Sequence, residues 1–383
     1  MQKSVRFQAG AVLLLSLCCV LAFGRSAFCA EKILCVYDRG FVPLAYERNQ
    51  KALGFEADVL RAALQYSSYE PRFEAMDDWS KAQQRVSGGE AKVALGMTRT
   101  PIRDKVFLFP KTPSVDLNLS FFVRSSEGMH NVNDIRGHQV GTLGDTLYER
   151  LLESFGGVSV RRFETEDEGL TALKNGEVDA FFGADRIIRY HIQRDNISGL
   201  KTVGIPLAQV PVYFAVHRHT PKLRDAIEQG LERILENGRY DKLFRKWFVR
   251  ELSPKQKTQL LTAAQKARGA RYLPGRGHGE GAAVLMCSGK MYSAGSLVKG
   301  PTQDYSPLES ALLQAAAAGN LEVRAVTVVK ANGEARVLSA KERKFVRHFG
   351  RDVLVLWDPS PGTHATWMIT QMLPYSGKGA SRQ

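Results

Sequence analysis

Residues 172–186 read ALKNGEVDAFFGADR, and this stretch decides the fold because it passes from a helix through a glycine turn into an apolar strand. The spacing predicts a helix over residues 166–174 and a strand over residues 178–182. The same alternation of helical and strand-like runs continues in both directions over residues 31–252. Strands that alternate with helices are typical of an α/β fold with mainly parallel sheets.

Further elements of this alternation are predicted on either side. Strands are expected over residues 33–36, 93–97, 137–142 and 212–216, and helices over residues 54–65, 146–155 and, as a pair, 221–248. This part of the sequence has no paired carboxylates, no glycine-rich phosphate loop and no nucleophile beside a base. Its pattern therefore does not point to catalysis.

The first thirty residues have the pattern of a secretory signal peptide. Lys3 and Arg6 precede an unbroken apolar run over residues 11–23, and small residues follow as far as Ala30. The apolar run is shorter than the roughly 20 residues that span a bilayer, so an uncleaved membrane anchor is the less favoured alternative. We therefore expect a signal peptide over residues 1–30 and a periplasmic protein.

The formal net charge of the chain is +14, and it is distributed unevenly. Residues 31–252 carry about +1, whereas residues 253–383 carry about +10. Export makes DNA or RNA an improbable partner for this charge. Two cysteines remain after the signal peptide, Cys35 and Cys287. We expect both to be free, with Cys35 buried in a strand, and we expect no metal or other cofactor.

Five short motifs occur in order along residues 31–252. They are YDRGFVPLAY with GFEADVL (residues 37–60), GMTRTPIR (96–103), DIRGHQVGTLGDT (134–146), ALKNGEVDAFFGADR (172–186) and ENGRYDKLFRKWF (236–248). Together they resemble the family 3 extracellular solute-binding proteins, the amino-acid-binding type of bacterial transport receptor. The resemblance covers nearly all of residues 31–252.

This resemblance implies a two-lobed periplasmic binding protein type II fold. Lobe one would comprise residues 31–118 and 212–252, and lobe two residues 119–211. The crossing strands would lie near residues 119–123 and 210–216. The ligand would bind in the cleft between the lobes, which close over it, and a membrane transporter or receptor would sense the closure.

The resemblance also implies the residues that hold an amino acid. Arg103 stands at the arginine of the family's TxxR signature, where its planar guanidinium would grip the ligand carboxylate. Gly96 and Thr98 match positions that meet the ammonium and carboxylate, and Thr146 would complete the carboxylate site where a helix begins. The alternatives are a surface salt bridge for Arg103 and a plain helix cap for Thr146.

Two further features would set specificity. The family's ammonium-binding acid falls on Ala184, so either Asp185 takes its place or the ammonium contact is missing, in which case a simple carboxylate or other anion becomes the better ligand. The side-chain pocket would be lined from lobe one, and its aromatic walls suggest a polar or cationic ligand side chain. Its residues are Asp38, Phe41, Tyr46 and Trp79. Alternatively, Phe41 and Trp79 belong to the core and Asp38 caps a turn.

Residues 253–383 are predicted to form a second, smaller domain. Helices are expected over residues 255–268, 307–318 and 341–349, and strands over residues 282–286, 291–297, 324–330 and 353–357. This order, with LLTAAQKARGARYLPG (260–275), GAAVLMCSGKMYSAG (281–295), SPLESALLQAAAAGN (306–320) and MLPY (372–375), resembles the α/β/α cytidine deaminase fold.

The chemistry of a zinc deaminase is absent from the matching positions. Ser306 stands at the first ligand, Leu308 at the proton-shuttling glutamate, and Ser339 and Glu342 at the two cysteines. Hydroxyl groups do not replace thiolates as zinc ligands, so we expect a domain that kept its fold and lost its reaction. An H-x-E sequence at His278 lies in a glycine-rich loop and is not followed by C-x-x-C.

The sequence thus favours an exported, non-enzymatic protein that captures an amino acid or similar small polar solute for a membrane transporter or sensor. The basic residues 341–351 would dock on an anionic partner, or form a solvated helix face. One alternative is an exported nucleoside or nucleobase deaminase with a sensory domain. Another is an interaction protein in which both domains are relics.

Overall fold

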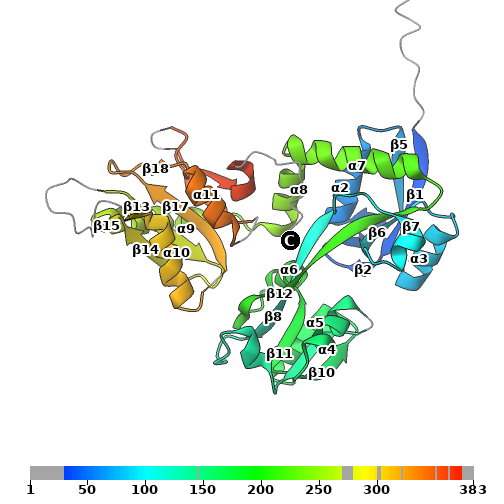
Figure 1. The fold of residues 1–383 in the computed structure, drawn as a ribbon, viewed down its shortest axis with the longest axis horizontal. Helices are drawn as coiled ribbons and strands as arrows, with labels where there is room; N and C mark the ends of the chain where they lie inside the picture. Colours follow the sequence, from blue (N-terminus) through cyan, green and yellow to red (C-terminus); the bar gives the residue numbers. More distant parts are fainter. Residues whose placement is uncertain are drawn as a thin grey trace, which may run out of the picture.

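The computed structural model describes residues 30–144, 146–269, 279–299, 303–320, 322–349, 352–360 and 363–372. Residues 1–29, which hold nearly all of the expected signal peptide, lie outside these ranges, and so does His278. Two main sheets, each with its own helices, make up the described part of the chain (Figure 1). Within these ranges, no helix has both the length and the apolar character needed to cross a membrane.

The first sheet has the strand order β10-β9-β11-β8-β12-β6-β1-β5, with β7 paired to β12. One half of it, which we call lobe one, contains β1, β5, β6 and β7 with the helices α2, α3, α7 and α8 (Figure 1). The bounds are β1 (Glu31–Asp38), α2 (Phe55–Leu64), β5 (Tyr69–Met76), α3 (Trp79–Ser87), β6 (Val93–Thr98), β7 (Phe107–Leu108), α7 (Pro221–Glu236) and α8 (Arg239–Phe248). Shorter elements are β2 (Gly40–Phe41), β3 (Ala45–Arg48), β4 (Lys51–Leu53) and the 3₁₀ turn η1 (Arg103–Lys105).

The other half, lobe two, has the same kind of arrangement. Strand β9 pairs in parallel with β10 and β11, and α4, α5 and α6 each follow one of these strands. The bounds are η2 (Val132–Ile135), β9 (Gln139–Leu143), α4 (Leu147–Phe155), β10 (Ser159–Phe163), α5 (Glu166–Asn175), β11 (Ala180–Ala184) and α6 (Asp185–Arg194). The helices predicted over residues 54–65, 146–155 and 166–174 are confirmed as α2, α4 and α5.

Two long antiparallel strands, β8 (Val115–Arg124) and β12 (Leu200–His217), join the lobes (Figure 1). Their ladder shifts register between Val203 and Ala208, so residues 204–207 have no partners in it. On one side of this interruption β8 also pairs with β11, and beyond the other side β12 pairs with β6. The interruption therefore lies between residues 200–203 of β12 and the part of β12 that pairs with β6 of lobe one.

A glycine explains why the GFEADVL motif begins as it does. Gly54 has φ 122°, and a Cβ atom there would lie 2.3 Å from the carbonyl oxygen of Leu44. Only glycine adopts this backbone conformation and tolerates such a close approach. The motif therefore fixes the turn that packs α2 beside β3.

The second main sheet belongs to the C-terminal domain and has the order β14-β13-β17-β19-β20, with β18 paired to β17. Strands β17 and β19 are parallel, and the other neighbours are antiparallel. The bounds are α9 (Pro254–Gly269), β13 (Gly281–Met286), β14 (Met291–Gly295), α10 (Pro307–Ala317), β17 (Val323–Val329), β18 (Ala335–Arg336), α11 (Ala340–Arg347), β19 (Leu354–Trp357), β20 (Ala365–Met368) and η3 (Ile369–Met372). The strand predicted over residues 291–297 is wrong at its end, because β15 (Leu297–Lys299) pairs separately with β16 (Gln303–Tyr305).

A buried carboxyl group braces the junction of lobe one with the crossing strands. Glu56 is fully buried, and its Oε1 lies within hydrogen-bonding reach of the Ser114 hydroxyl, which also donates to the carbonyl oxygen of Val212 at 2.9 Å. A hydroxyl has one proton and a carbonyl oxygen only accepts, so a protonated Glu56 that donates to Ser114 satisfies both contacts. Burial, opposed by Ser114, raises the pKa of Glu56 to about 8.

This carboxyl makes the stability of lobe one depend on pH. Between an ordinary pKa of 4.5 and about 8 the folded protein binds one proton more than the unfolded chain, so its stability falls as pH rises. The loss amounts to roughly 5 kcal/mol across that window. We expect Glu56→Gln, whose amide donates at any pH, to remove this loss in urea denaturation followed by tryptophan fluorescence.

The exposed Glu70 on β5 supplies the matched control, because Glu70→Gln should leave the pH profile of the wild-type protein unchanged. A Glu56→Gln variant that loses stability between pH 5 and pH 8 as steeply as the wild type would show that Glu56 is already ionised in the folded state.

Candidate functional site at the lobe boundary

The predicted site residues follow the carboxyl ends of parallel strands. In lobe one, Asp38 ends β1, Trp79 follows β5, and Thr98 ends β6. In lobe two, Thr146 follows β9 and Asp185 follows β11. In open parallel sheets ligands bind outside these strand ends, because the carboxyl ends share one edge of the sheet.

Arg103 is held by the end of β6. Its Nη1 donates to the carbonyl oxygen of Thr98 at 2.8 Å and to the hydroxyl of Thr98 at 2.7 Å. No carboxylate of the described residues lies within ion-pair distance of its guanidinium, so the alternative of a surface salt bridge finds no support there. The backbone oxygen and hydroxyl fix the orientation of a half-buried cation that has further N–H groups to offer.

A second arginine, which the sequence did not single out, lies close to Arg103. Burial and the positive charge of Arg150 lower the pKa of Arg103. Arg150 belongs to α4 of lobe two, four residues after Thr146, so it lies on the same face of the helix. The positive charge of a lobe-two arginine thus acts on Arg103 of lobe one, an effect that a bound anion would offset.

Gly96 and Phe41 are in contact, as the proposed pocket requires. Gly96 has φ +82°, and a Cβ atom there would lie 2.9 Å from Cε1 of Phe41. The ring of Phe41 therefore packs on the bare backbone of β6, which no other residue would allow without a shift. The ring also packs against the core of lobe one.

Tyr46 reaches across the lobe boundary. Its ring packs edge-on against Trp247 with centroids 6.1 Å apart, and its hydroxyl group is hydrogen-bonded to Tyr190 on α6 of lobe two. Tyr190 is a second residue that the sequence did not single out. The structure therefore has the two lobes in direct side-chain contact at this point.

The remaining predicted residues of lobe one, and Thr146 of lobe two, have structural partners. Asp38 accepts a hydrogen bond from the backbone of Gly40 at 2.8 Å, and Trp79 packs against a cluster of apolar side chains between α3 and the sheet. The Thr146 hydroxyl donates to Leu143 at 2.8 Å and accepts from Glu149 at 3.4 Å. The helix-cap and turn-cap interpretations are thus confirmed for Thr146 and Asp38, although neither contact prevents a side chain from meeting a ligand.

Asp185 lies at the start of α6. Burial raises its pKa, opposed by Arg186 and Arg189, and the other acid beside it is Asp352 of the C-terminal domain. Arg186 pairs with Asp352 at 3.4 Å, and Arg189 pairs with Glu322. The Asp185 carboxyl thus lies near the contacts between α6 and the C-terminal domain, and its Oδ1 is buried without a hydrogen-bond partner among the described residues. Its role as the ammonium-binding acid stays a prediction.

Glu166, at the first position of α5, is the acid that the sequence did not single out in lobe two. Burial raises its pKa, and the neighbouring charges of Asp167 and Asp38 act in the same direction, whereas His191 opposes them. Asp38 belongs to lobe one. An acidic pair from opposite lobes therefore faces the boundary, in addition to the pair of arginines.

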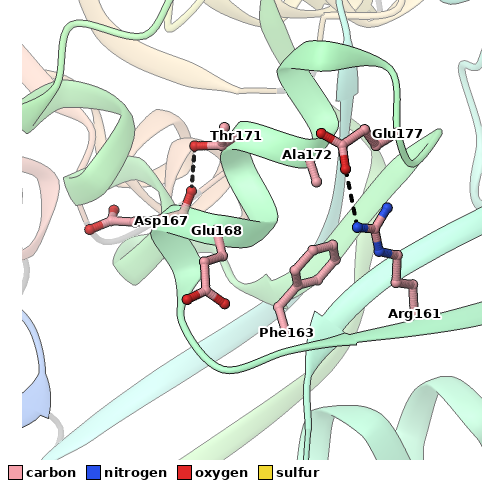
Figure 2. A pocket seen from close by; sticks show the side chains of 7 residues that line it. All are labelled: Arg161, Phe163, Asp167, Glu168, Thr171, Ala172 and Glu177. Atoms are coloured by element: carbon pink, nitrogen blue, oxygen red, sulfur yellow. Dashed lines mark hydrogen bonds and ion pairs between the residues drawn. The ribbon is translucent and has the colours of Figure 1, made fainter.

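Surface grooves elsewhere do not coincide with these residues. One, of about 490 Å³, lies between β10 and α5, where Arg161 pairs with Glu177 at 3.1 Å beside the ring of Phe163 (Figure 2). Another, of about 420 Å³, is lined by Lys51, Ala52, Leu53, Arg61 and Phe73. Both are open, and Arg161, Asp167 and Arg61 among their charged side chains already have partners within the chain, so neither has the character of a binding site.

In the C-terminal domain, the residues at the positions that match the zinc ligands of a deaminase lie around the guanidinium group of Arg336. Ser306 caps α10 and donates to Glu342 at 2.7 Å, and Ser339 caps α11. The guanidinium of Arg336 binds Glu342 at 2.8 Å and Glu280 at 2.6 Å. Leu308 is buried in the core. Over the described ranges, no three His, Cys, Asp or Glu side chains are placed to hold a metal ion.

The two cysteines behave as predicted. Cys35 is buried in β1 and Cys287 is exposed, and both are free. Burial raises the pKa of the Cys35 thiol, so Cys35 does not have the character of a reactive thiolate.

Comparisons with known proteins agree with this geometry. Residues 33–250 match the family model of the bacterial extracellular solute-binding proteins, family 3. The putative ABC transporter arginine-binding protein 2 of Escherichia coli (strain K12) is 25% identical over 240 residues, 60% of this chain and 96% of that protein. The L-cystine-binding protein TcyK of Bacillus subtilis (strain 168) is 28% identical over 181 residues, 45% of this chain and 67% of that protein.

A solved structure of an ancestral arginine-binding protein bound to arginine superposes with a TM-score of 0.50 at 25% identity, covering 57% of this chain and 99% of that one. The N-terminal part thus has the α/β type II periplasmic binding protein fold. Because the family model spans more than half of the sequence, the chain belongs to the bacterial extracellular solute-binding proteins, family 3.

Proposed function

We propose that this protein binds an amino acid between its two lobes, on the periplasmic side of a membrane, and presents it to an ABC-type transporter or a sensor. The observation that carries the proposal is the guanidinium of Arg103, which is oriented by two hydrogen bonds to Thr98 and has no carboxylate partner among the described residues. Relatives whose names state arginine or cystine binding support an amino-acid ligand. The signal-peptide pattern of residues 1–30 supports export.

The charges at the lobe boundary fit a zwitterion. Arg103 and Arg150 form a positive pole, and Asp38 and Glu166 form a negative one. Like charges from opposite lobes repel when nothing lies between them, whereas a carboxylate and a cation would neutralise both poles. Binding would therefore favour the closed arrangement.

Replacing Arg103 tests this function. We expect Arg103→Ala to weaken amino-acid binding about 100-fold or more, because a desolvated charge pair loses one partner. The measurement is isothermal titration calorimetry with the standard amino acid that stabilises the wild-type protein most in a thermal-shift screen.

Arg99 offers the matched control, since it lies on the same segment but is exposed and pairs with Asp104 at 2.7 Å. Arg99→Ala should bind as the wild type does. An Arg103→Ala variant with wild-type affinity, or a wild-type protein that no amino acid stabilises, would contradict the proposal.

For the C-terminal domain we propose an accessory, non-catalytic role on a deaminase-like fold. The N-termini of α10 and α11 meet at Glu342, where Arg336 supplies the positive charge that a metal would otherwise bring. A guanidinium cannot acidify a water molecule as zinc does. The basic helix α11 would then offer its exposed face to an anionic partner.

Measuring the metal content distinguishes this non-catalytic role from the alternative, a zinc-dependent deaminase. We expect purified protein to contain no stoichiometric zinc by inductively coupled plasma mass spectrometry and to release no ammonia from cytidine. One zinc ion per chain together with ammonia release would establish a deaminase instead.

The ion pair between Arg336 and Glu342 also predicts that this domain becomes less stable to unfolding at low pH. Burial acts to raise the pKa of Glu342, but hydrogen bonds from Arg336, Ser306 and the backbone of Ser339 outweigh it and lower the pKa from 4.5 to about 2. The contribution of Glu342 to stability is therefore present above about pH 4.5 and is lost as pH falls towards 2. It amounts to roughly 3 kcal/mol.

We expect Glu342→Gln to unfold more easily than the wild type near neutral pH and to differ little from it near pH 2, in urea denaturation followed by circular dichroism. Glu334→Gln, on a surface turn of the same domain, is the control. If the free energies of unfolding of Glu342→Gln and the wild type differ as much at pH 2 as at pH 7, the ion pair is not the cause of the difference.

A further inference from the structure

Ala184 stands where the family has its ammonium-binding acid, so another acid would have to take that role. Glu166 at the start of α5 is an acid at the lobe boundary that has no assigned role. It begins α5 directly after β10, whose carboxyl end lies at the same edge of the sheet as those of β9 and β11. Side chains at this edge reach the region between the lobes. Its position thus corresponds to those of Thr146 after β9 and Asp185 after β11.

The surroundings of Glu166 place it near lobe one. The charge of Asp38, which ends β1, acts on Glu166, and the charge of Glu166 acts on Tyr148, a buried residue of α4. Among the described residues, no side chain donates a hydrogen bond to the Glu166 carboxylate or forms an ion pair with it. Its neighbour Asp167, in contrast, binds His191 at 2.6 Å and Arg194 at 2.7 Å. Glu166 is therefore left available for a group from outside the chain.

His191 supplies an independent observation at the same place. It is only 5% exposed, and its Nδ1 is occupied by Asp167, but its Nε2 has no hydrogen-bond partner among the described residues. A buried ring nitrogen without a partner is costly unless a ligand or an ordered water satisfies it. His191 interacts with Glu166, so the unsatisfied polar atom and the available acid belong to one cluster.

We propose that Glu166 is the lobe-two acid that receives the cationic group of the ligand, opposite Asp38 of lobe one, in place of the acid missing at Ala184. This assignment rests on the amino-acid-binding function proposed above. The group it receives is an organic cation, either the α-ammonium of the ligand or a cationic side chain. Two acids from opposite lobes require such a cation between them when the lobes close, because their like charges otherwise oppose closure.

The test compares Glu166→Gln with Glu168→Gln. Glu168 lies two residues along the same helix, is exposed, and accepts a hydrogen bond from the Glu164 backbone that a glutamine would keep. The probes are L-arginine and L-citrulline, which share shape but differ in side-chain charge, together with the amino acid that binds the wild-type protein most tightly. Affinity is measured by isothermal titration calorimetry on full-length protein with matched circular dichroism spectra.

We expect Glu166→Gln to weaken the tightest ligand about 10-fold or more, the cost of losing a charged hydrogen bond, while Glu168→Gln binds as the wild type does. A loss confined to L-arginine identifies the side chain as the cation, whereas a loss shared by L-citrulline identifies the α-ammonium.

Three results would overturn the assignment. They are wild-type affinity in Glu166→Gln, a loss of affinity in Asp185→Asn without one in Glu166→Gln, and tighter binding of the ligand to Glu166→Gln. If Arg103→Ala abolishes binding and Glu166→Gln does not weaken it, only this inference fails. If no amino acid binds the wild-type protein, the proposed function fails with it.

Discussion

The antiparallel ladder of β8 and β12 is the constraint on which the rest of the N-terminal part depends. Both strands run through both lobes, so a single sheet extends from β10 at one edge to β5 at the other. The register of the ladder shifts at residues 204–207, which have no partners in it. Bulges of this kind bend a strand while the sheet stays continuous. Glu56 and Ser114 brace the lobe-one side of the crossing, next to Val212 of β12.

The ladder also decides which side chains meet. Within each lobe the parallel strands bring their carboxyl ends to one edge, β1, β5 and β6 in lobe one and β9, β10 and β11 in lobe two, and the predicted site residues lie at these ends. A ligand shifts a conformational equilibrium only by as much as it binds one state better than the other. Here the difference would come from neutralising a pair of arginines and a pair of acids that are brought together by closure.

Helix α6 connects this boundary with the rest of the molecule. Tyr190 contacts Tyr46 of lobe one, the guanidinium of Arg186 lies 4.6 Å from the ring centroid of Phe244 on α8, and Arg189 pairs with Glu322 of the C-terminal domain. The C-terminal domain also contacts lobe one, where Arg245 donates to the carbonyl oxygen of Thr366 at 2.9 Å. A rotation of lobe two therefore has to change the packing of α6 against its neighbours.

Much of this arrangement could be predicted from the sequence, and the exceptions share a physical cause. Central strands such as β6 and β11 are buried on both faces and appear as apolar runs, whereas the edge strands β5 and β10 are half exposed and read YEPRFEAM and SVRRF. The sequence does not predict β10, so it gives no sign that Glu166, three residues after the end of β10, lies at the carboxyl edge of the sheet. Arg150 and Tyr190 lie on helix faces whose orientation depends on tertiary packing. Asp185 was predicted from its distance along the chain, which does not show that the start of α6 lies near Asp352 and Glu322 of the C-terminal domain.

A crystal structure of the protein with its tightest amino-acid ligand is the most direct test of the central claim. The account predicts that the ligand carboxylate lies within hydrogen-bonding distance of Arg103, between the end of β6 and the beginning of α4. A ligand bound outside the lobe boundary, or an Arg103 guanidinium turned away from it into solvent, would contradict the account.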